Sequence, residues 1–125
     1  VLPPGTHAST FGGNPLACAA GIAVFEAFEQ EDVLGNCRRM AAELWDRLYD
    51  LKAEHDHIQS IRGVGLMIGV VLDTEARPVL EQARQQGLLV LTAGENVLRL
   101  MPPLTIDPET VAEGCEILDR IFWGI

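Results

Sequence analysis

The spacing of apolar residues predicts two helices in the first half of the chain. Residues from about Pro15 to Glu29 are rich in alanine and apolar on several sides, which predicts a helix buried on more than one face. A second helix is expected from Val33 onward, with apolar residues on one side and charged residues on the other. Its apolar stripe consists of Val33, Cys37, Met40, Leu44, Leu48 and Leu51.

Between Ile61 and Leu72 the side chains alternate with a period of two residues, which predicts one strand. Because glycine weakens strands, three glycines on one face of this strand indicate close approach by another backbone or by a ligand. One face is expected to carry Val64, Leu66, Ile68, Val70 and Leu72, and the other Gly63, Gly65, Met67, Gly69 and Val71.

The rest of the chain predicts a helix, a hairpin and a final helix. We expect a helix over 74–86, strands over 88–92 and 97–101 that pair as a hairpin, and a last helix capped by Asp107 with Pro108 at its start. The buried side of that last helix is expected to be Ile117, Leu118, Ile121 and Phe122. This order predicts an α+β fold, a small and mostly antiparallel sheet with helices packed on it.

Composition limits the classes of partner. The 125 residues carry 9 basic and 18 acidic side chains, a net charge of −9, which argues against nucleic acid and anionic membrane as partners. No apolar run reaches membrane-spanning length, and no signal-peptide pattern opens the chain. Cys18, Cys37 and Cys115 are far apart, so we expect buried thiols in a reducing cytosol.

The stretch from Thr6 to Gly21 contains the strongest candidate site. Two hydroxyls, Ser9 and Thr10, precede a Gly12-Gly13 pair, and Asn14-Pro15 then forms a favourable helix start. A helix start favours anions, so the stretch predicts an anion-binding turn, although any capped helix after a glycine turn has the same pattern.

Three other candidates have competing interpretations. Gly63-Val64-Gly65 fails the dinucleotide pattern, because the next glycine comes late and no helix follows. His55 and His57 could chelate a metal from a strand, but no third ligand accompanies them, so we expect a solvated polar turn. Arg99 is either an outward-facing arginine on an edge strand or a fork for a carboxylate.

The stretch 6–21, together with Arg62–Gly69, Gly87–Val90 and Asn96–Leu104, closely resembles the C-terminal portion of class-III, pyridoxal-phosphate-dependent aminotransferases. The resemblance implies the small domain of a homodimeric cytoplasmic enzyme over 14–125. It also implies an arm over 1–13 that belongs to the cofactor-domain and dimer interface. The implied reaction moves the δ-amino group of N-acetylornithine to 2-oxoglutarate. Ornithine, succinyl-diaminopimelate and putrescine remain alternative amino donors.

The same resemblance assigns roles to individual residues. Thr10 matches the threonine that binds the cofactor phosphate across the subunit interface. Ser9 matches a neighbouring position that lies near the substrate and the phosphate. Arg99 falls where the family places the arginine for the substrate α-carboxylate. The lysine that holds the cofactor lies upstream in the family, and Lys52, in a polar helical stretch, is expected to be a surface residue. The chain alone is therefore expected to be inactive. A free-standing carboxylate-binding regulatory module is the alternative outside this family.

Overall fold

The computed structural model describes residue 3 and residues 9–125 of the chain. The chain divides into two compact units, residues 1–33 and residues 34–125. Residues 1, 2 and 4–8, which include most of the predicted arm and the Thr6–Ala8 part of the candidate stretch, lie outside the described residues. The predicted boundary between residues 13 and 14 stays a prediction.

The first unit contains the helix α1 (Pro15–Gln30), as predicted. Asn14 caps it: its side-chain oxygen accepts the backbone N–H of Ala17 at 3.0 Å, and Pro15 occupies the first helical position. No residue of α1 is buried, and apolar side chains such as Leu16 and Phe25 are 80% and 71% exposed. The predicted burial of this helix therefore requires contacts beyond those that the described residues make.

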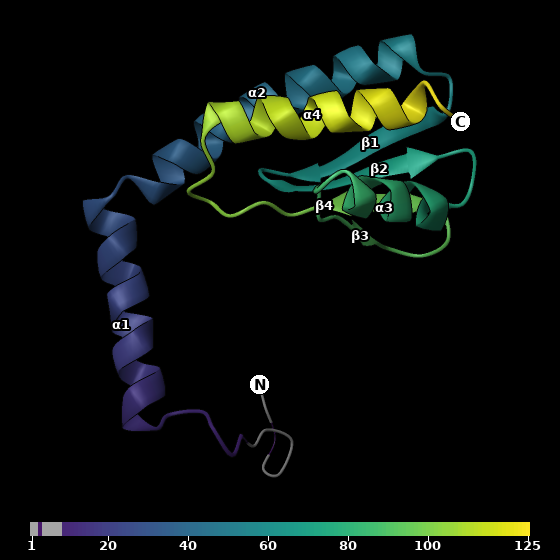
Figure 1. Ribbon diagram of the computed structural model, residues 1–125. Helices are drawn as coiled ribbons and strands as arrows, with labels where there is room; N and C mark the ends of the chain where they lie inside the picture. The colour runs from purple at the N-terminus through teal and green to yellow at the C-terminus, as the bar shows by residue number, and fades with distance from the viewer. Residues whose placement is uncertain (1–2, 4–8) are drawn as a thin grey trace. The chain divides into compact units, whose positions relative to one another are not determined.

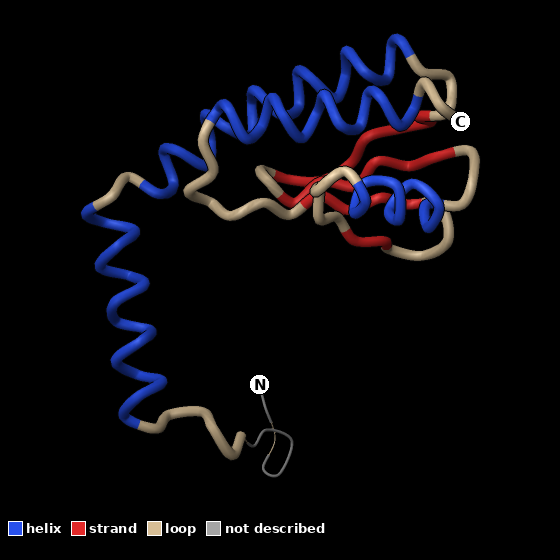
Figure 2. Tube along the Cα trace, in the orientation of Figure 1, coloured by secondary structure: helices blue, strands red, loops and turns tan. Residues whose placement is uncertain are grey.

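The second unit is an α+β fold, as predicted, with a four-stranded antiparallel sheet in the order β1-β2-β4-β3 (Figure 1). Its strands are β1 (Ile58–Val64), β2 (Met67–Leu72), β3 (Leu91–Thr92) and β4 (Val97–Leu100). Its helices are α2 (Val33–Glu54), of which only the first residue belongs to the first unit, α3 (Ala76–Gln85) and α4 (Pro108–Phe122). The tube in Figure 2 shows the long helices α2 and α4 running side by side, and α3 packs against β3, β4 and α4.

The strand predicted over 61–72 is wrong, because this stretch is a hairpin of two strands. Gly65 and Leu66 form the turn, and Gly65 has φ of +56°, which glycine adopts without strain. Gly63 has φ of +147°, and a Cβ there would lie 2.1 Å from the Met67 carbonyl oxygen. The glycines do mark close approach by another backbone, as predicted, but that backbone is the returning strand of the same hairpin.

The two faces of the sheet differ in what covers them. The face toward the helices carries Ile68, Val70, Leu72, Leu98 and Leu100, all buried in one core with most of the apolar stripe of α2 and the predicted buried side of α4. We call the opposite side the open face, because none of its residues belongs to that core. From the register it carries Ser60, Arg62 and Val64 of β1, Met67, Gly69 and Val71 of β2, Val97 and Arg99 of β4, and Leu91 of β3.

The predicted solvated turn at the two histidines is wrong for His55. Its side chain is only 3% exposed, its Nε2 lies 2.7 Å from an Asp119 carboxylate oxygen, and its ring contacts Phe122 and Trp123. It therefore joins the C-terminal ends of α2 and α4. Glu54 lies close enough to complete a cluster of three potential metal ligands, but the hydrogen bond to Asp119 already occupies His55 Nε2. His57 is partly exposed beside Asp73.

Candidate functional site

The loop before α1 is held by short-range hydrogen bonds. The Ser9 hydroxyl oxygen accepts the backbone N–H of Gly12 at 2.9 Å, and the Asn14 amide donates to the Phe11 carbonyl. A Cβ on Gly12 would lie 2.9 Å from the Ser9 oxygen, and Gly13 has φ of +75°. Gly13 is therefore favoured by the positive φ of the loop, whereas a side chain at Gly12 would have to displace the Ser9 hydroxyl.

This loop presents groups that suit an anion. Ser9 and Thr10 are exposed, and the Thr10 hydroxyl makes no hydrogen bond within the described part of the chain. The loop leads into the start of α1, whose first turn contains no acidic residue to neutralise its partial positive charge. The donor set fits a phosphate, which accepts hydrogen bonds from hydroxyls and backbone N–H groups.

Arg99 lies in the middle of β4, which is an interior strand between β2 and β3. The edge-strand interpretation is therefore wrong. The side chain is partly buried, and its Nε is buried without a hydrogen-bond partner among the described residues. A buried donor without an acceptor costs free energy. This guanidinium is therefore available to donate a hydrogen bond to a ligand or to another part of a larger protein.

The end of β4 is fixed by a residue that the sequence did not single out. The Asn36 amide in α2 donates to the carbonyl oxygens of Leu104 and Ile106 at 2.9 and 3.0 Å. These bonds attach the proline-containing segment after β4 to α2, and so restrict the movement of the strand that carries Arg99. No sequence pattern could identify Asn36, because its partners lie about seventy residues away.

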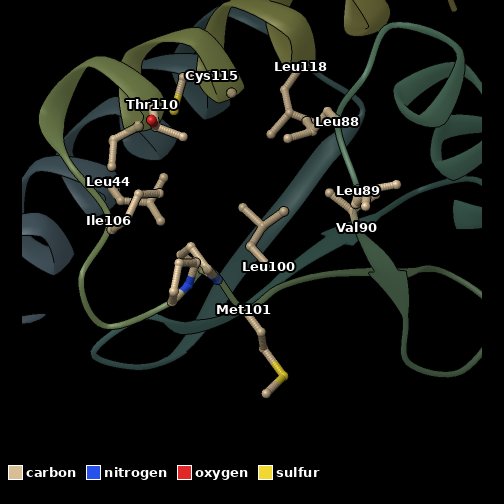
Figure 3. Close-up of a pocket in the computed structure, with 14 residues that line it drawn as sticks. Leu44, Leu88, Leu89, Val90, Leu100, Met101, Ile106, Thr110, Cys115 and Leu118 are labelled. Carbon is tan, nitrogen blue, oxygen red and sulfur yellow. The ribbon is translucent and has the colours of Figure 1, made fainter.

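An apolar cavity of the second unit lies on the helix side of the sheet, not on the side of Arg99. It measures about 350 Å³ and is lined mostly by aliphatic residues of β4, α4 and the segment before β3. Figure 3 shows Leu100 pointing into it, with Thr110 and Cys115 of α4 on its wall, while Met101 points away. Without a charged lining residue, this cavity does not suit a carboxylate or a phosphate.

The remaining candidate residues have mixed outcomes. Lys52 is exposed in the last turn of α2, as expected. All three cysteines are free, but only Cys115 is buried, while Cys37 is partly buried and Cys18 is exposed. Burial raises the pKa of the Cys115 thiol to about 11, so this thiol is protonated and inert at neutral pH.

Ser9 and Thr10 are exposed hydroxyl donors in the first unit, and Arg99 is a partly buried donor in the second. Taken separately, hydroxyls beside a helix start suit the phosphate of a cofactor such as pyridoxal phosphate, and a guanidinium suits the carboxylate of a substrate. The exposed Lys52 offers no pocket for the aldehyde of that cofactor.

Comparison with known proteins identifies the family of the chain. The family model "Aminotransferase class-III" matches residues 1–122. The chain is 42% identical to acetylornithine aminotransferase of Caldanaerobacter subterraneus, over 98% of this chain and 31% of that protein. It is 43% identical to ornithine aminotransferase 1 of Staphylococcus aureus, again over 98% of this chain but 30% of that protein.

Solved structures show the same relationship. The crystal structure of acetylornithine aminotransferase from Elizabethkingia anophelis matches with a TM-score of 0.88 at 28% identity, over 98% of this chain and 33% of that one. The chain spans about a third of the length of such relatives. The family match, the identities and the fold agree, and the chain therefore belongs to the class-III aminotransferase family.

Proposed function

We propose that the chain is the C-terminal part of a pyridoxal-phosphate-dependent enzyme that transfers the δ-amino group of N-acetylornithine to 2-oxoglutarate, a step of arginine biosynthesis. The observation that carries this proposal is the partly buried Arg99, whose Nε has no hydrogen-bond partner among the described residues, in a chain of this family. The complete enzyme is proposed to be a cytoplasmic homodimer with a large domain that supplies the cofactor lysine. Among the described residues, no helix is long and apolar enough to cross a membrane.

In this enzyme Arg99 binds the carboxylate next to the reacting carbon of 2-oxoglutarate. The planar guanidinium offers two parallel N–H donors, so it fixes both the position and the rotation of that carboxylate. Fixing the carboxylate also fixes the neighbouring carbonyl carbon, which must stay aligned with the cofactor for transfer to occur.

Thr10 and Ser9 hold the phosphate of the cofactor, with the hydroxyl of Thr10 donating a charge-assisted hydrogen bond. Their loop binds the phosphate in the active site of the partner subunit, so each active site depends on the dimer. When bound, pyridoxal phosphate supplies the electron sink that amino-group transfer needs.

The choice of amino donor rests on the similarity to known enzymes. The matches include acetylornithine aminotransferases at 42% and 39% identity. Ornithine is the main alternative, because an ornithine aminotransferase is equally similar at 43% identity. Succinyl-diaminopimelate is a further alternative donor. Putrescine fits less well, since it has no carboxylate for an arginine to bind.

Expression of the full-length gene product with pyridoxal phosphate tests the proposal. We expect transfer to 2-oxoglutarate, with a higher kcat/KM for N-acetylornithine than for ornithine, succinyl-diaminopimelate or putrescine. A preference for ornithine would replace the proposed donor, and no transfer from any of the four would refute the proposed reaction. The intact mass of the native gene product, measured in parallel, should be well above that of this chain.

The chain by itself should be inactive. After incubation with pyridoxal phosphate and borohydride reduction, mass spectrometry should find no stoichiometric label on Lys52, because an exposed lysine has no pocket to hold the cofactor. Stoichiometric labelling of Lys52 would contradict this expectation.

A further inference from the structure

Arg99 lies close to the point where the sheet stops supporting β4. On the β2 side the last paired residue of β4 is Leu100, opposite Ile68, and on the β3 side it is Arg99 itself, opposite Leu91. The strand ends one residue after Arg99, at Leu100. Strand ends open more readily than strand centres, because fewer interactions hold them. The position of Arg99 therefore depends on what fixes the chain after β4.

The segment that follows β4 is stiff. Met101 precedes Pro102 and Pro103, whose rings fix φ, and a residue before a proline is restricted to extended conformations. A turn comes next, in which the backbone N–H of Ile106 donates to the Pro103 carbonyl oxygen at 3.0 Å. Because few dihedral angles between this turn and β4 are free, a shift of the turn is transmitted to Arg99.

Asn36 holds this turn through its side-chain amide. Its Nδ2 lies 2.9 Å from the carbonyl oxygen of Leu104 and 3.0 Å from that of Ile106. An amide nitrogen has two N–H bonds, so one side chain supplies a donor to each carbonyl, and its own rotation is thereby fixed. Prolines have no N–H, so Asn36 supplies donors in a segment that is poor in them. We call these two hydrogen bonds the Asn36 clamp.

The other end of the clamp is anchored in the core. Asn36 is the fourth residue of α2, and this helix packs into the core through the buried Met40 and Leu44 in its following turns. Leu104 and Ile106 are partly buried and pack against the same core, which also contains Leu100 of β4. The clamp therefore fixes the segment after β4 relative to the body of the second unit.

We propose that Asn36 is a positioning residue of the aminotransferase reaction: it acts through Arg99, by keeping the end of β4 where the guanidinium meets the carboxylate beside the reacting carbon. This inference rests on the function proposed above. A planar guanidinium binds a carboxylate at two points, so a small shift of its strand misaligns both hydrogen bonds at once. Asn36 thus contributes to the alignment of the substrate and leaves the charge of the site unchanged.

The test is a double-mutant cycle in the full-length enzyme, with Asn36→Ala and Arg99→Lys measured singly and together. In Asn36→Ala we expect kcat/KM to fall roughly threefold to thirtyfold for 2-oxoglutarate and for pyruvate, because both carry a carboxylate beside the reacting carbon. In the Arg99→Lys background the same change should lower kcat/KM less than about twofold, since the fork that Asn36 aligns is already absent. A loss that arose from stability alone would be equal in both backgrounds.

Trp45→Phe is the matched control. Trp45 lies on the same helix, and its Nε1–H donates to the Gly65 carbonyl oxygen at 3.0 Å, so this variant also removes a bond from an α2 side chain to a backbone carbonyl. It should lower Tm but change kcat/KM less than about twofold in either background. Asn36→Ser, which keeps one donor, should lie between wild type and Asn36→Ala, and it takes the place of Asn36→Ala in the cycle if that variant does not fold.

Each remaining outcome counts against the inference. Unchanged kcat/KM in Asn36→Ala, or equal losses in both backgrounds, would overturn the role of Asn36 and leave the proposed function intact. If neither Asn36 variant folds, the residue acts on stability alone and the inference is wrong. If the wild-type enzyme transfers no amino group, the proposed function fails, and calorimetric binding of 2-oxoglutarate to the same four proteins completes the cycle. Additive losses of affinity, or no binding to the wild type, would then overturn the inference as well.

Discussion

Replacing Arg99 by lysine tests the binding role of this residue without removing its charge. Lysine places a single ammonium group where the guanidinium offered a planar fork, so it cannot donate two parallel N–H bonds to one carboxylate. The structure makes the loss more severe, because Nε of Arg99 is a buried donor that no acceptor occupies in the part of the chain that the structure describes. The ammonium of a lysine would have to reach the same carboxylate without that fixed inner donor.

The magnitude follows from the bonds removed. Loss of one charge-assisted hydrogen bond costs about 1.5–3 kcal/mol, and poorer alignment of the reacting carbon adds to it. We expect kcat/KM of the full-length Arg99→Lys enzyme to fall roughly tenfold to a thousandfold for 2-oxoglutarate and for pyruvate, equivalent to about 1.4–4 kcal/mol of transition-state stabilisation.

Steady-state kinetics with a saturating amino donor measures this change, and thermal unfolding of the same preparations provides the control. Arg77→Lys is the matched variant, because it makes the same replacement on the exposed surface of α3. Unchanged kcat/KM for both oxo acids would refute the binding role. A loss of thermal stability large enough to account for the lower rate would also refute it, since Arg99 would then act only within the sheet.

Three further predictions concern the loop, the hairpin and the cysteines. Thr10→Ala in the full enzyme should weaken retention of the cofactor during dialysis by about 1.5–3 kcal/mol, the value of one hydrogen bond to a charged phosphate, and cofactor retained as in wild type would leave Thr10 as a turn residue only. Gly63→Ala should lower the free energy of unfolding by about 2–3 kcal/mol in chemical denaturation, since its Cβ would lie 2.1 Å from the Met67 carbonyl oxygen; a change near zero would contradict this geometry. At pH 8 the exposed Cys18 of the chain should react with a thiol reagent much faster than Cys115, whose pKa is raised to about 11 by burial, and equal rates would show that Cys115 is not protected.

The sequence alone determined the features that depend on neighbours along the chain. The start of α1 follows from Asn14 and Pro15, and the start of α4 from Asp107, whose carboxylate accepts the N–H of Thr110 at 2.7 Å. The stripe of α2 and the buried side of α4 follow from apolar spacing. Helix periods and caps involve residues within a few positions of each other, so they can be predicted before any tertiary contact is known.

The hairpin shows where this local reasoning fails. Alternation from Val64 to Leu72 continues through the turn, so Gly65 and Leu66 have the pattern of strand residues. Val64 and Leu66 were expected on one face of a strand, but Leu66 is buried and Val64 is 85% exposed on the open face. A two-residue turn interrupts the strand without interrupting the apolar period, and a period cannot report the change of direction.

Tertiary structure alone decided the surroundings of the chemically important side chains. The burial of His55 depends on Asp119 and Phe122, which the chain supplies more than sixty residues later. The interior position of β4 depends on strand order, and the bonds from Asn36 to the segment after β4 join residues about seventy positions apart. These properties arise because distant segments pair to bury one face of the sheet, and the sequence shows which residues can bind a carboxylate but not which of them become neighbours.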